Sequence, residues 1–125
     1  MLGATAMVVL LLHSPVVIDG DTISGTIENI PEVFGKNISV RLAGIDTAEV
    51  HSHCDNEAIL AKQAVTRVKE LLGNAKEVEI RNPQRDKYFR LVGDVVIDGI
   101  SVNATLLHEA LARPYSGGTK RSWCR

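Results

Sequence analysis

The clearest strand pattern in the sequence is ISVRL, residues 38–42. Its apolar residues alternate with Ser39 and Arg41, so one face of the predicted strand is buried while these two side chains point the other way. Residues 43–55 follow with little periodicity and are predicted to form a loop. Residues 56–72 then carry apolar side chains on one stripe, which predicts a helix.

Turn and cap residues bound the other predicted elements. Asp55 or Asn56 can cap the start of the helix and Gly73 its end, and Asn103 can cap a shorter helix that runs to residue 111. Short β-branched or alternating runs predict further strands at residues 16–18, 22–23, 26–27, 77–81 and 89–97. The resulting order, β-β-β-α-β-β-α, indicates a mainly β fold with helices (α+β), a closed five-stranded barrel of the oligonucleotide-binding type with two to three flanking helices.

Length and composition indicate one globular domain. A chain of 125 residues is too short to split into halves that each bury a useful core. Hydrophobic residues make up 45% and charged residues 23% of the chain, which excludes disordered, collagen-like and coiled-coil proteins. No apolar run approaches the roughly 18 residues of a membrane helix. We therefore expect a single domain over residues 16–125 that is monomeric and has no stable membrane association.

Charge is distributed unevenly along the chain. Residues 1–57 hold two basic and eight acidic residues, a net of −6, and residues 58–125 hold twelve and seven, a net of +5. The total of −1 argues against a protein that coats nucleic acid by bulk charge. An acidic cluster that faces a basic remainder is what a cation site beside a phosphate site requires, although a salt-bridged surface would give the same totals.

Residues 1–15 contain an apolar run, AMVVLLL at residues 6–12. It resembles the apolar core of an export signal, but no basic residue precedes it and His13-Ser14-Pro15 is a poor cleavage site. A signal remnant and a first strand are therefore equal alternatives.

The two cysteines, Cys54 and Cys124, are too few for a disulfide framework. They either form one bridge between the end and the middle of the chain or are two ordinary thiols. A zinc site formed with His51 and His53 is a weaker alternative, because it crowds ligands on neighbouring loop positions without a Cys-x-x-Cys or His-x-x-x-His pair.

Three segments carry residue types that bind cations and phosphates. In VIDGDT, residues 17–22, two carboxylates flank a glycine at a strand end and suit a hard cation. In RLAGIDTAE, residues 41–49, an arginine leaves a strand and polar groups follow in a tight turn. RDKYFR, residues 85–90, is basic with aromatics inside it, as a phosphate and base site would be. Taken singly, each is a weak signal: the first is more often only a turn, the second also fits a strand with a capped exit, and the third also fits a solvated hairpin arm.

Together and in this order, with a helix between the second and third, these segments resemble the staphylococcal nuclease (thermonuclease) family. The string VVIDGISVNATLLHEALARPY, residues 95–115, extends the resemblance, and Gly117-Gly118 and Trp123-Cys124 are similar to the tail of a compact bacterial branch of that family. The resemblance implies the oligonucleotide-binding barrel and calcium-dependent hydrolysis of phosphodiester bonds in DNA and RNA, with 3′-phosphate ends.

The resemblance also implies a cation site. The calcium ligands would be the carboxylates of Asp21 and Asp46 and the backbone carbonyl of Thr47. Calcium prefers oxygen ligands and tolerates a partly solvated site, so this set is chemically sufficient. Asp19 would orient the ligands through hydrogen bonds.

Catalytic and substrate residues follow from the same resemblance. Arg41 and Arg90 would hold the phosphate, because a guanidinium fork matches phosphate oxygens. Glu49 would accept a proton from the attacking water or orient it. Lys87 and Tyr88 would border the terminal phosphate and the nucleotide pocket.

The sequence departs from the family pattern at three places. Ala48 replaces the usual proline before Glu49, which leaves this loop less rigid. Phe89 replaces the usual glycine, so we expect a different turn before Arg90. Only Tyr115 is available for the base-stacking tyrosines of the family.

A non-catalytic oligonucleotide-binding module, for nucleic acid or protein, is the main alternative function. Relatives of that kind lose the acidic and arginine set, whereas this chain keeps it, so we expect a nuclease with DNA or RNA as substrate. A nonspecific nuclease would endanger its own host, which favours a secreted or periplasmic protein over a cytoplasmic one.

Overall fold

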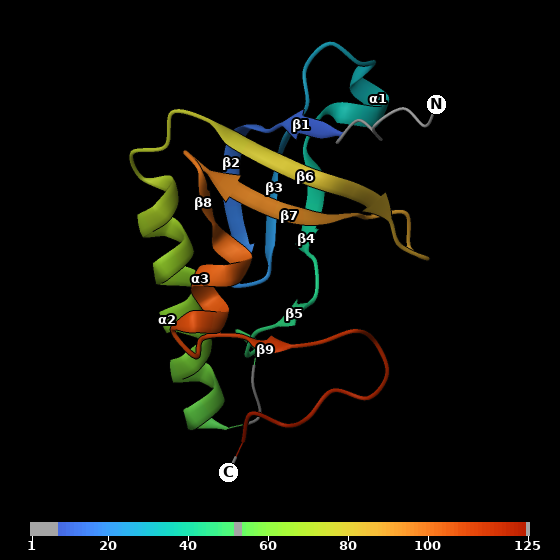
Figure 1. The fold of residues 1–125 in the computed structure, drawn as a ribbon. Coiled ribbons are helices and arrows are strands. Elements are labelled where there is room, and N and C mark those ends of the chain that lie inside the picture. Colours follow the sequence, from blue (N-terminus) through green and yellow to red (C-terminus); the bar gives the residue numbers. More distant parts are fainter. Residues whose placement is uncertain (1–7, 52–53, 125) are drawn as a thin grey trace, which may run out of the picture.

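The computed structural model describes residues 8–51 and 54–124, which form strands and three helices (Figure 1). The elements in chain order are β1 (Val9–Leu11), β2 (His13–Asp19), β3 (Thr22–Thr26), α1 (Glu32–Gly35), β4 (Ile38–Leu42), β5 (Ile45–Asp46), α2 (Asp55–Leu72), β6 (Val78–Arg85), β7 (Leu91–Ile97), β8 (Ile100–Ser101), α3 (Val102–His108) and β9 (Arg113–Pro114). None of the described helices is long and apolar enough to span a membrane. The first seven residues of the predicted N-terminal segment lie outside the described residues, and of its remainder residues 9–11 belong to β1 and residues 13–15 to β2.

The main sheet has the strand order β1-β6-β7-β4-β3-β2, with β8 added on β7, and β5 pairs separately with β9. Neighbours within it are antiparallel except β4 and β7, which are parallel. Only Leu12 separates β1 from β2 in the chain, so the sheet curves until its two outermost strands are successive parts of one segment. The predicted α+β, oligonucleotide-binding-like fold is therefore confirmed. No ladder joins β1 directly to β2 among the described residues, so the predicted complete closure is not observed.

Strand β4 occupies the bounds that the alternating pattern predicts and lies between β3 and β7. Val40 and Leu42 are fully buried, whereas Arg41 between them pairs in register with Thr22 and Val92. The core around β4 is built from buried apolar side chains of the sheet and of helices α2 and α3, including Ile23, Val68, Ile80, Val95, Val102 and Leu106. Burial on this scale holds β4 rigidly and so fixes the place where Arg41 leaves the sheet.

Helix α2 lies beside the β2–β3 turn and sets its position (Figure 1). A Cβ at Gly20 would lie 2.6 Å from the Cβ of Ala64 and 3.0 Å from Oγ1 of Thr47. Only glycine therefore allows the turn to approach the helix and the following loop this closely. The aspartates on either side of this glycine are fixed by the same close contact.

Gly73 is the C-cap of α2, as predicted, whereas the predicted N-caps of α2 and α3 are wrong. Neither Asp55 nor Asn56 caps α2, which begins at Asp55. Ser101 caps α3 by accepting a hydrogen bond from the backbone of the third residue after it. Asn103 is buried instead, and its side-chain amide donates to the carbonyl of Ala43 over 2.8 Å. The pattern also missed α1 and β5 within the predicted loops, and α3 ends earlier than predicted.

Candidate active site

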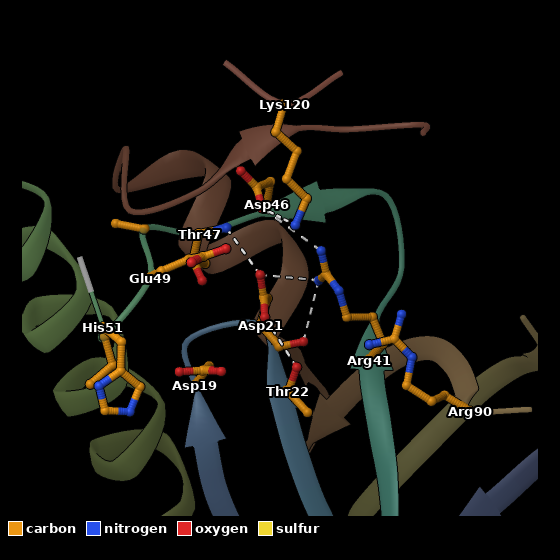
Figure 2. Close-up of a pocket in the computed structure, with 12 residues that line it drawn as sticks. Asp19, Asp21, Thr22, Arg41, Asp46, Thr47, Glu49, His51, Arg90 and Lys120 are labelled. Atoms are coloured by element: carbon orange, nitrogen blue, oxygen red, sulfur yellow. Dashed lines mark hydrogen bonds and ion pairs between the residues drawn. The ribbon is translucent and has the colours of Figure 1, made fainter. Parts of the chain in front are cut away.

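A pocket of about 310 Å³ opens where β2, β3 and β4 meet β5 (Figure 2). Its lining consists of Asp19, Asp21, Thr22, Arg41, Asp46, Thr47, Ala48, Glu49, Val50, His51, Arg90 and Lys120. The residues to which the family resemblance gives a part in binding the cation, in holding the attacked phosphate or in moving the proton all border this pocket. Lys87 and Tyr88 lie in an adjoining pocket.

Asp21 is a buried carboxylate of the pocket and is only 9% exposed. Its Oδ2 lies 3.2 Å from Nη1 of Arg41 and accepts a hydrogen bond from the backbone amide of Thr47 over 3.2 Å. Its Oδ1 accepts from the hydroxyl of Thr22 over 3.1 Å. Nη1 of Arg41 also donates to the carbonyls of Asp21 and Leu42, at 3.4 and 3.3 Å. The β3–β4 register thus places a guanidinium directly against a buried carboxylate.

Asp46, 6% exposed, is contacted from three directions. Its Oδ1 lies 3.1 Å from Nζ of Lys120 and 3.9 Å from Nη2 of Arg41. Its Oδ2 accepts a hydrogen bond from the indole Nε1 of Trp123 over 3.2 Å. Arg41 therefore bridges two carboxylates, as Figure 2 shows. The sequence patterns did not identify Lys120 and Trp123, because no local spacing connects them to Asp46.

Oxygen atoms alone make up the possible cation ligands at the centre of the pocket. Oγ1 of Thr47 is a buried oxygen with no hydrogen-bond partner in the described part of the chain. Buried carboxylates require a counter-charge, which Arg41 and Lys120 supply in this structure. Two buried carboxylates with a threonine beside them suit a hard divalent cation, and no nitrogen or sulfur ligand is needed. The residues present therefore fit such a cation.

Asp19 shares the acidic side of the pocket with Glu49 and His51. Its pKa lies above its ordinary value because burial disfavours the charged form and because Asp21 and Glu49 repel that charge, while His51 and Arg41 oppose the shift. In Figure 2, Glu49 and His51 lie across the pocket from the two arginines. The pocket therefore has an acidic and a basic wall, as a site for a cation beside a phosphate requires.

The adjoining pocket, of about 740 Å³, continues the basic wall past Arg90 to the tail and also borders Tyr115. Arg90 is held by Asp86, whose Oδ2 lies 2.7 Å from its Nε. Desolvation acts to raise the pKa of Asp86, but hydrogen bonds from the Arg90 side chain and from the backbone amides of Arg90 and Tyr88 hold it below its usual value. Tyr88 is 66% exposed, and the guanidinium carbon of Arg90 lies 5.4 Å from the centroid of its ring.

Phe89 adopts a left-handed backbone conformation with φ of 63°, and the residue is 78% exposed. A Cβ in this region costs about 1–2 kcal/mol, and an exposed ring recovers little of that by burial. We expect Phe89→Gly to be more stable than Phe89→Ala by about 0.5–1 kcal/mol, since both lose the ring and only alanine keeps the strain. Urea unfolding of the two variants measures the difference, and equal midpoints would contradict it.

A disulfide joins Cys54 and Cys124, which are 70 positions apart. It ties the C-terminal tail, residues 115–124, to the start of α2. Trp123 consequently packs on Ala48, and the guanidinium carbon of Arg113 lies 3.7 Å from the centroid of its ring. Ala48 is 2% exposed, so packing against the tail restrains the loop at the position where proline is usual.

The zinc alternative does not fit this structure. Zinc binds cysteine as a thiolate, and both sulfurs are bonded to each other. His53 lies outside the described residues.

Comparisons with known proteins agree with this geometry. The family described as "Staphylococcal nuclease homologue" matches residues 39–122. Endonuclease YncB of Bacillus subtilis (strain 168) is 41% identical over 98 residues, which cover 77% of this chain and 44% of the relative. The SPbeta prophage-derived endonuclease YokF of the same organism is 39% identical over 99 residues, 77% of this chain and 31% of the relative. The chain thus spans less than half the length of these curated relatives. Because the family match covers well over half of the sequence, the chain belongs to the staphylococcal nuclease family.

Proposed function

We propose that this protein is a calcium-dependent nuclease that hydrolyses phosphodiester bonds of DNA, RNA or both and leaves 3′-phosphate ends. One observation carries the proposal: two buried carboxylates bridged by an arginine open into a basic pocket that contains a second arginine. Both curated relatives bear the name endonuclease, which supports the same class of reaction.

The cation would be held by the carboxylates of Asp21 and Asp46 and by the backbone carbonyl of Thr47. Calcium at this place would offset the charge that builds on the phosphate oxygens and orient a water molecule. So few protein ligands suggest a dissociation constant of about 10⁻⁴–10⁻³ M. Asp19, beside Asp21 across the glycine turn, would orient this set through hydrogen bonds.

The arginines would bind the phosphate that is attacked. Arg41 and Arg90 both border the pocket, and their forks match the oxygens of a phosphodiester whose charge grows in the transition state. Glu49, on the opposite wall, would take the proton of the attacking water at a carboxylate oxygen. Lys87 and Tyr88 would contact the neighbouring phosphate and base in the adjoining pocket, where the exposed ring offers a stacking surface.

The compartment is part of the same proposal. A disulfide between Cys54 and Cys124 persists in an oxidising environment and is rare in the cytosol. This supports a secreted or periplasmic location.

Cleavage of single-stranded DNA and RNA in about 10 mM calcium tests the proposal, at a concentration set by the expected affinity. We expect fragments with 3′-phosphate ends, none when a chelator is present, and a rate that is lower by about 10²–10⁴-fold in Glu49→Gln. The matched control is Glu32→Gln on α1, at the far end of the sheet from the pocket, which should cleave at the wild-type rate (Figure 1). Binding of the oligonucleotide without cleavage in any divalent cation would instead favour the non-catalytic binding module.

A further inference from the structure

Two residues of the C-terminal tail each contact one carboxylate oxygen of Asp46. Lys120 places its ammonium 3.1 Å from Oδ1, and Trp123 donates its indole N–H to Oδ2 over 3.2 Å. Asp46 is almost completely buried, so the ammonium of Lys120 and the more distant guanidinium of Arg41 balance its charge, and the indole N–H of Trp123 supplies a hydrogen bond. Asp46 is a proposed cation ligand, so tail contacts on both of its carboxylate oxygens affect its affinity for a cation.

The two tail contacts differ in how firmly they are held. The backbone carbonyl of Trp123 accepts a hydrogen bond from Asn56, its ring stacks under Arg113, and the next residue forms the disulfide. The side chain of Lys120, in contrast, is 44% exposed and also borders the adjoining basic pocket. Trp123 is therefore a fixed contact, and Lys120 can leave Asp46 at little cost in packing.

We propose that Lys120 is a resident counter-ion that holds Oδ1 of Asp46 until a divalent cation takes that oxygen, and that it then contacts a substrate phosphate in the adjoining pocket. Trp123 is the positioning residue that keeps Oδ2 fixed while this exchange takes place. The proposal rests on the proposed function, because it assigns the substrate phosphate to the same site.

The exchange predicts opposite changes in calcium affinity when Lys120 and Trp123 are substituted. An ammonium on Oδ1 competes with a cation, so Lys120→Met should bind calcium about fivefold more tightly, which corresponds to the loss of a partly exposed ion pair. Trp123→Phe keeps an aromatic ring but loses the N–H, and should bind calcium about tenfold more weakly, as the loss of a ligand-orienting hydrogen bond commonly does.

Calcium titration of the melting temperature, without nucleic acid, measures both affinities because a cation that binds only the folded chain stabilises it. The matched control is Lys36→Met, an exposed lysine that pairs with Glu32 on α1, far from the pocket (Figure 1). It removes the same charge and should leave calcium affinity unchanged. Asp21→Asn, which lacks a proposed ligand, should lose most of the calcium response.

A second measurement, of oligonucleotide binding, tests the proposed contact between Lys120 and a substrate phosphate. In the Glu49→Gln background with calcium, Lys120→Met should bind a single-stranded oligonucleotide several-fold more weakly and lower its salt slope by about one phosphate contact. Lys36→Met should change neither quantity.

The outcomes separate this proposal from the nuclease assignment. Calcium affinity that is unchanged or weaker in Lys120→Met overturns the exchange, even if the wild type cleaves nucleic acid. Lys120 is exposed enough for this variant to fold, so a destabilised Trp123→Phe does not remove the test. Tighter calcium binding in Lys120→Met, weaker binding in Trp123→Phe and no cleavage would support the cation exchange while contradicting the nuclease.

Discussion

Arg41→Lys is expected to lower the rate of phosphodiester cleavage by about 10²-fold or more. The substitution keeps the positive charge and removes the guanidinium fork, so the lower rate measures the contribution of the two-pronged contact with phosphate oxygens. Arg41 lies between Asp21 and Asp46 and is only 13% exposed in its side chain, which leaves a lysine no room to recover the second contact. In the proposed reaction this guanidinium would contact the phosphate, and its low exposure would make that charged contact strong.

Arg90→Lys should also slow cleavage, but by a smaller factor. Its side chain is 43% exposed, and Asp86 holds it through Nε. A lysine there loses the Asp86 contact as well as the fork, while solvent screens the lost charge contacts.

Arg67→Lys is the matched control for both variants. Arg67 makes a fork on Glu109, with Nε at 2.8 Å and Nη2 at 3.0 Å from its carboxylate oxygens, on the α2–α3 surface. Arg67→Lys removes the same kind of guanidinium fork at a place away from the pocket, so this variant should cleave at the wild-type rate. Single-turnover rates at saturating substrate measure all three variants, and near-wild-type cleavage by Arg41→Lys would contradict its assignment to the phosphate.

The parts of the site that the sequence predicted are those that local patterns encode. Alternation in residues 38–42 placed Arg41 at a strand, and Asp19-Gly20-Asp21 was predicted as a turn at a strand end. Both depend on neighbours in the chain, so a single sequence is enough to find them.

The parts that could not be predicted depend on contacts across long stretches of chain. Asn103 has the residue type of a cap, yet it is buried because its amide bonds to a backbone 60 positions away. Asp46 meets Trp123, 77 positions away, only because the tail is tied back to α2. The periodicity of the sequence does not predict either contact. Burial and hydrogen bonds from another element can outweigh the local preference of a residue for a cap or a turn.

The double variant Cys54→Ala/Cys124→Ala is expected to lose about 4 kcal/mol of stability in the chain-entropy description of a loop of this length. The bridge closes 70 positions, so its removal restores a large conformational freedom to the unfolded chain. For a domain of this size the loss corresponds to a melting temperature lower by about 15 °C.

The functional consequence of losing the bridge is separate from the loss of stability. The bridge keeps Trp123 against Ala48 and against Oδ2 of Asp46, so the double variant should also bind calcium more weakly, as is expected of Trp123→Phe. Reductant should lower the melting temperature of the wild type and leave that of the double variant unchanged, which distinguishes the bridge from any other effect of the two substitutions. Two free thiols in the unreduced wild type, by mass spectrometry, would contradict the bridge. If the reduced wild type melts lower but keeps its full calcium affinity, the tail stabilises the fold without holding Asp46.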